Sequence, residues 1–167
     1  MRFYFLNEKI FILEVTKMKE NRLIDLREKE DFKATTIANK LNVSKVTYSL
    51  WENNKTPIPT KRIVELADYY KVNIDYLLNL SNKKKYIEKD TTNLNLENIG
   101  KNLEEIRNHL GLSLRKLGSR INYSSSALCR YEQGKCLIKS EPLIILCQIS
   151  NYSIDWVLGR SNEKFIK

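Results

Sequence analysis

Two stretches of the chain carry cationic side chains with almost no acid among them. Glu52 is the single acid between residues 33 and 61, and Glu132 is the single acid between residues 115 and 139. The cations are Lys33, Lys40, Lys45, Lys55 and Lys61 in the first stretch, and Arg115, Lys116, Arg120, Arg130, Lys135 and Lys139 in the second. Lysine and arginine neutralise phosphate, so a net charge of +9 with this placement favours a polyanionic partner. A solvated basic face without a partner is the alternative for either stretch.

Both stretches belong to a repeat. Residues 22–82 and 102–162 share one pattern at a constant offset of 80, without a gap. Apolar positions stay apolar under this offset, as at Ile37 and Leu117, so the two copies are expected to bury the same faces. A repeat of about 60 residues is close to the smallest size that supports its own core. The sequence therefore predicts two copies of one small helical domain.

The second and third helices of each copy have the spacing of a helix-turn-helix. Small residues, Ala38 and Gly118, stand where the two helices must cross closely. Asn42 and Asn122 stand in the tight turn, where a left-handed backbone is needed and asparagine tolerates it best after glycine. The expected helix caps are Ser44, Ser124, Thr60, Ser140, Asn73 and Ser153 at N-termini, with Asn54 and Gly134 just past the ends of the third helices. Ordinary helix punctuation is the alternative for any one of them.

The sequence predicts an all-α protein. The expected helices lie at about 17–30, 34–41, 45–53, 60–70 and 74–80, and at about 97–110, 114–121, 125–133, 140–150 and 154–159. The expected parts of the chain are an N-terminal extension (1–16), domain 1 (17–82), a polar linker (83–96), domain 2 (97–162) and a tail (163–167). Residues 1–16 are aromatic and β-branched, which favours a short β-hairpin; an unstructured extension, or a true start at Met18, is the alternative.

The two copies resemble the Cro and phage-repressor family of helix-turn-helix domains. The matching stretches are IANKLNVSKVTYSLWENNK and LGSRINYSSSALCRYEQGK, with NIDYLL and SIDWVLG at the ends of the copies. The resemblance implies two tandem five-helix, lambda-repressor-like domains, each of which places its third helix in the major groove. The implied base-reading residues are Lys45, Val46, Thr47 and Leu50 in domain 1, and Ser125, Ser126, Ala127 and Arg130 in domain 2. The implied phosphate contacts are Asn53, Lys55, Gln133 and Lys135.

The two reading helices differ in chemistry. Arg130 can donate a bidentate pair of hydrogen bonds to guanine, and Ser125 and Ser126 can address several base edges. Val46 and Leu50 offer mainly contact with the methyl groups of thymine. Domain 2 is therefore expected to read sequence better, while domain 1 either adds affinity through phosphate contacts or is purely structural.

A recurring arginine and glutamate complete the site. Glu52 follows Arg27 by 25 residues, and Glu132 follows Arg107 by the same separation. The family resemblance implies a buried or half-buried ion pair that joins the first helix to the end of the third. This role is structural and not catalytic.

The favoured function is a sequence-specific transcriptional regulator that binds double-stranded DNA, a repressor in preference to an activator. An enzyme is disfavoured because His109 is the only histidine and no cluster has the spacing of metal ligands or of a nucleophile and its base. No cofactor, metal or small-molecule ligand is expected. A homodimer is compatible with the sequence. The alternative is a protein-interaction module, such as an antitoxin-like protein, that binds a partner through the N-terminal segment or domain 1.

The expected location is the cytoplasm. Cys129, Cys136 and Cys147 are odd in number and fit no paired metal spacing, which favours free thiols in a reducing compartment. The chain has neither an apolar run of membrane-spanning length nor the architecture of a signal peptide. No membrane partner is therefore expected.

Overall fold

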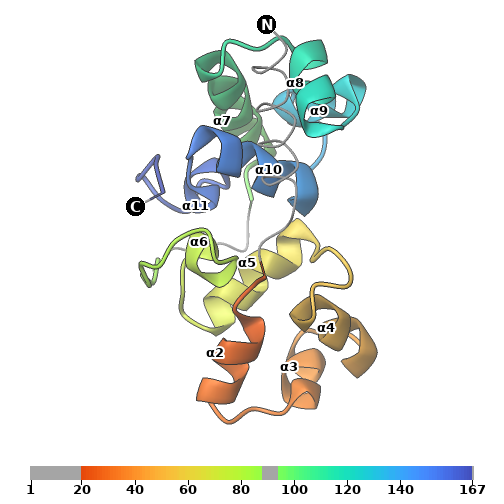
Figure 1. The fold of residues 1–167 in the computed structure, drawn as a ribbon, viewed down its shortest axis with the longest axis vertical. Helices are drawn as coiled ribbons and strands as arrows, with labels where there is room; N and C mark the ends of the chain where they lie inside the picture. Colours follow the sequence, from red (N-terminus) through yellow and green to blue (C-terminus); the bar gives the residue numbers. More distant parts are fainter. Residues whose placement is uncertain (1–19, 88–93, 167) are drawn as a thin grey trace, which may run out of the picture. The chain divides into compact units, whose positions relative to one another are not determined.

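The computed structural model describes residues 20–87 and 94–166, and every regular element within those ranges is a helix (Figure 1). A single antiparallel bridge, between Tyr152 and Phe165, is the one β-type pairing that these residues contain. The predicted all-α class is confirmed. The predicted N-terminal hairpin lies outside the described residues.

The chain divides into two compact units. Within the described ranges, the first unit comprises residues 20–87 and the second comprises residues 94–165. The helices of the first unit are α2 (Leu23–Lys29), α3 (Ala34–Lys40), α4 (Lys45–Glu52), α5 (Thr60–Tyr69) and α6 (Ile74–Leu77). Those of the second are α7 (Leu96–His109), α8 (Leu114–Ile121), α9 (Ser125–Glu132), α10 (Ser140–Ser150) and α11 (Ile154–Val157). Adding 80 to the bounds of α4 and α6 gives those of α9 and α11, so these helices repeat in the structure at the same offset as in the sequence.

Each unit buries one apolar face of every helix in its own core. In the first unit Leu23, Ile37 and Leu66 are fully buried, and they come from α2, α3 and α5. In the second unit Ile106, from α7, and Leu117, from α8, are buried in the same way. Burial of such side chains stabilises a fold by roughly 1.5–3 kcal/mol each, which is the main source of stability for units this small.

The first helix of the first unit is shorter than predicted. It begins at Leu23 instead of residue 17, and the described residues before it are not helical. Two contacts fix this start: the Arg22 backbone N–H donates to the Leu77 carbonyl at 2.9 Å, and the Asn21 side chain accepts the Leu23 N–H at 3.0 Å. The fifth helices are also shorter, since α6 ends before Asn79 and α11 before Gly159, both of which have a positive φ (57° and 73°).

The predicted caps of the fourth helices are wrong by one residue. Thr60 and Ser140 are the first helical residues, and the N-cap positions belong to Pro59 and Lys139, neither of which makes a side-chain cap hydrogen bond. Asn73 occupies its predicted N-cap position without such a bond, because its side-chain oxygen accepts the Lys85 backbone N–H at 2.9 Å. The start of the predicted linker is thereby attached to the first unit.

Candidate nucleic-acid interface

The turn between the second and third helices is built alike in both units. Asn42 and Asn122 adopt a left-handed conformation, each with a φ of 51°. The residue after each asparagine donates its N–H back to the preceding helix, Val43 to Ala38 O at 3.0 Å and Tyr123 to Gly118 O at 2.8 Å. These bonds satisfy carbonyls that a helix end would otherwise leave unpaired. The prediction of a left-handed asparagine in the turn is confirmed in both copies.

The serine that follows the turn starts the third helix. Ser44 accepts the Thr47 N–H at 3.0 Å, and Ser124 accepts the Ala127 N–H at 3.4 Å. Gly118 suits the close approach of α8 to the turn before α9, because a Cβ there would lie 2.6 Å from the Tyr123 carbonyl oxygen. The serine cap thus sets the starting point of the third helix in each unit.

The third helices, α4 and α9, have the same exposure pattern from Lys45 to Trp51 and from Ser125 to Tyr131. Their inner faces are buried, as at Trp51 and Tyr131. The residues predicted to read bases all lie on the accessible face: Lys45, Val46, Leu50, Ser125, Ser126 and Arg130 are exposed, and Thr47 and Ala127 are half-buried. Each third helix therefore presents its four candidates together.

The residues predicted to contact phosphate come directly after α4 and α9 in the chain. Asn53 and Gln133 are the C-caps of α4 and α9, and the next residues, Asn54 and Gly134, have φ values of 53° and 65°. The Lys55 backbone N–H donates to the Leu50 carbonyl at 2.8 Å, and the Lys135 backbone N–H donates to the Arg130 carbonyl at 3.0 Å. Asn53, Lys55, Gln133 and Lys135 are all exposed. The turn thus sets a cation beside the end of each third helix.

The surrounding cations are available to a ligand. Lys40, Arg115, Lys116 and Lys139 are exposed and Arg120 is half-buried. No salt bridge within the described ranges engages any of these five side chains. The surface around α4 and α9 is therefore basic without internal neutralisation, which suits phosphate.

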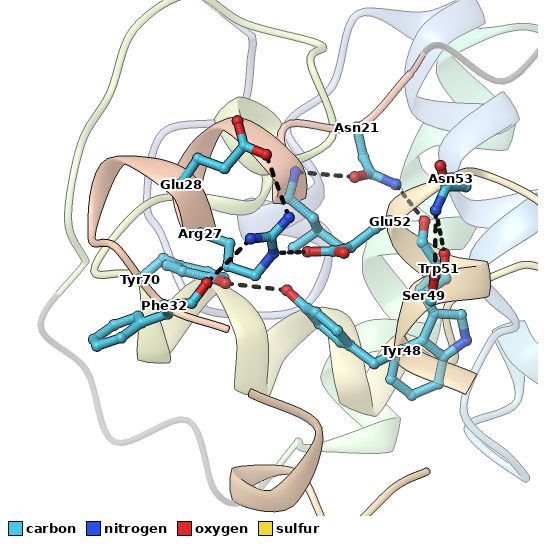
Figure 2. A network of polar contacts seen from close by, with 11 residues as sticks. Asn21, Arg27, Glu28, Phe32, Tyr48, Ser49, Trp51, Glu52, Asn53 and Tyr70 are labelled. Carbon is cyan, nitrogen blue, oxygen red and sulfur yellow. Dashed lines mark hydrogen bonds and ion pairs between the residues drawn. The ribbon is translucent and has the colours of Figure 1, made fainter. Parts of the chain in front are cut away.

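An ion pair connects each third helix to the first helix of its unit. Arg27 Nε lies 2.6 Å from Glu52 Oε1, and Arg27 Nη1 donates to the Phe32 carbonyl at 3.0 Å (Figure 2). In the second unit Arg107 holds Glu132 through two hydrogen bonds, of 2.7 Å from Nε and 2.9 Å from Nη2. The hydrogen bond to glutamate raises the pKa of both arginines. Each ion pair holds the third helix of its unit against the first helix.

The first unit adds a buried hydroxyl pair at two positions that hold no tyrosine in the second unit. The Tyr48 and Tyr70 oxygens lie 3.1 Å apart beside Glu52 (Figure 2). Burial raises the pKa of Tyr70 to about 12 and raises that of Tyr48 further, so both hydroxyls remain protonated. Offsetting these positions by 80 gives Leu128 and Ser150. The pair therefore fastens α4 to α5 in the first unit alone.

Two supporting residues were not predicted from the sequence. Asn21 Nδ2 donates to the Trp51 carbonyl at 2.9 Å (Figure 2). It also donates to Asn54 Oδ1 at 2.8 Å, so it ties the chain before α2 to the end of α4. Gly100, in α7, lies against the end of α9, where a Cβ would stand 2.3 Å from the Glu132 carbonyl oxygen. A lone glycine inside a helical pattern was the available signal for this close approach.

Comparison with known proteins agrees with this geometry. Residues 23–77 match the family model described as Helix-turn-helix, which covers α2 to α6. No curated protein and no solved structure matches the chain. The match indicates a DNA-binding regulator and gives no support to an enzyme. None of the helices in the described ranges is both long and apolar enough to cross a lipid bilayer.

Proposed function

We propose that the protein is a sequence-specific regulator of transcription that binds double-stranded DNA through two tandem helix-turn-helix domains. The observation that carries the proposal is the recurrence, in residues 114–132, of the α3–turn–α4 geometry that lies within the family match. Each copy has a left-handed asparagine, a capping serine and an exposed third helix between unpaired cations. This combination suits entry of α4 and α9 into the major groove.

Phosphate contacts and base contacts have separate roles in this proposal. Lys55 and Lys135, with Asn53 and Gln133, bind the backbone and set the register of each domain on the duplex. The exposed residues of α4 and α9 face the base edges. Arg130 is the strongest base reader, because its guanidinium is exposed and makes no hydrogen bond within the described ranges.

The two domains bind two unlike half-sites in successive major grooves. The chain from Lys85, which is bonded to Asn73, to Asn95, the N-cap of α7, extends to at most about 33–36 Å, which is close to the spacing of about 34–36 Å between adjacent half-sites. The reading residues differ between α4 and α9, so the site of one chain is not a palindrome. The protein acts as a repressor, since a chain that occupies both half-sites excludes other proteins from them.

Selection of bound duplexes from a random pool tests this function. One sequence is expected to emerge and to bind the full chain in preference to random duplex, with an affinity that falls steeply as salt rises. A pool that yields no preferred duplex would contradict the proposal, and co-purification of a stoichiometric protein partner in its place would favour an interaction module.

A further inference from the structure

The third helix of the first unit exposes apolar side chains where its counterpart in the second unit exposes polar ones. Val46 is 67% exposed and Leu50 is 37% exposed. Residues four apart lie on the same side of a helix, so the two side chains form one apolar strip on the accessible face of α4. The equivalent positions of α9 are Ser126 and Arg130, which are also exposed. The fold therefore accepts polar residues at both positions and does not require the strip.

The polar neighbours of the strip are engaged within the helix. The Thr47 hydroxyl lies 2.9 Å from Ser44 Oγ, the atom that already accepts the Thr47 N–H. Asn53 Nδ2 donates to the Ser49 carbonyl at 2.8 Å and lies 3.4 Å from the Ser49 hydroxyl. The side chains of Thr47 and Asn53 thus make polar contacts within their own helix and its cap. Val46 and Leu50 remain as its outward features, beside the flexible cation of Lys45.

We infer that the first domain recognises the 5-methyl group of pyrimidines in the major groove, through Val46 and Leu50. The inference rests on the proposed entry of α4 into that groove. The C5-methyl group is the apolar feature that a base pair presents there. The Cβ atoms of residues four apart on a helix are about 5–6 Å apart, and base pairs rise by about 3.4 Å, so the two side chains reach methyl groups at neighbouring base pairs. The ligand is a 5-methylpyrimidine, either thymine or 5-methylcytosine.

Removing one methyl group at a time from the duplex tests this inference. The full chain is titrated with its selected site, in which uracil replaces thymine at each position of the half-site that α4 covers. Uracil removes the methyl group and keeps the pairing edge. Affinity is expected to fall about fourfold at each of two neighbouring positions, the equivalent of one buried methylene group, and about 15-fold when both are replaced. Replacing either thymine by cytosine is expected to weaken binding, and 5-methylcytosine is expected to restore it.

Variants of the protein assign the effect to the strip. Val46→Ala is expected to abolish the uracil penalty at one position and Leu50→Ala to abolish it at the neighbouring one. The matched control is Lys45→Ala, which is expected to weaken thymine and uracil duplexes by the same factor. The inference would be overturned by equal affinity for thymine and uracil duplexes, or by a uracil penalty that persists in the double variant Val46→Ala/Leu50→Ala. Either result would leave the proposed binding to duplex DNA intact. Failure to bind any duplex would overturn the proposed function as well.

Discussion

Removing Glu132 tests how the third helix is held in place. In Glu132→Ala the guanidinium of Arg107 loses both hydrogen bonds to the carboxylate. It keeps the Leu112 carbonyl at 3.1 Å, Asn108 Oδ1 at 3.0 Å and the exposed Glu104 carboxylate at 3.4 Å. The two side chains are 14% and 11% exposed, so water can compensate only in part. Breaking a buried pair costs about 3–5 kcal/mol when the remaining charge is left uncompensated; because Glu104 still faces Arg107, the expected loss lies at the lower end of that range, still a large fraction of the stability of a small domain.

The assay uses the distribution of tryptophan. The chain has 2 tryptophans, Trp51 in the first unit and Trp156 in the second, and both are buried. In a Trp51→Phe background, the fluorescence of Trp156 reports urea unfolding of the second unit. The control is Glu97→Ala, which breaks an exposed pair with Lys101 (75% and 67% exposed) and is expected to leave the midpoint unchanged. The explanation fails if Glu132→Ala and Glu97→Ala unfold at the same urea concentration.

Three further predictions concern packing, the turn and the length of the site. Gly100→Ala is expected to destabilise the second unit by about 1–3 kcal/mol, because the new Cβ would lie 2.3 Å from a backbone oxygen; a urea midpoint equal to wild type would show that the contact relaxes freely. Asn122→Val is expected to cost about 1–2 kcal/mol at its φ of 51°, and Asn122→Gly almost nothing, which circular dichroism melts can compare. Footprinting with the full chain is expected to protect two unlike half-sites about one helical turn apart, and protection of a single half-site would refute simultaneous binding by both domains.

Local features of the fold were predictable from the sequence. The left-handed turns at Asn42 and Asn122 and the caps at Ser44 and Ser124 depend on neighbouring residues, so their residue types carry the information. The repeat added strength to these predictions, because each feature occurs twice in the same register. The accessible faces of α4 and α9 followed from the same periodicity.

Features set by distant residues were not predictable in the same way. The start of α2 depends on contacts of Asn21 and Arg22 with residues 30 or more positions later. The role of Gly100 depends on where α9 lies, and the hydroxyl pair of Tyr48 and Tyr70 looks in the sequence like two ordinary core residues. Tertiary contacts of this kind leave no local pattern.

The central claim is that the third helix of each domain reads bases while the residues after it bind phosphate. Arg130 and Lys135 separate these roles within one domain, since both are exposed and lie at opposite sides of the turn that ends α9. Fluorescence anisotropy would measure Arg130→Ala and Lys135→Ala against the selected site and its single-base variants over a salt series. Arg130→Ala is predicted to lose about 1–3 kcal/mol on the selected site and to relax the preference at one base pair, whereas Lys135→Ala is predicted to weaken all duplexes alike and to lower the salt slope by about one. Equal losses from both substitutions, independent of sequence, would contradict base reading by Arg130 and leave it as a phosphate contact.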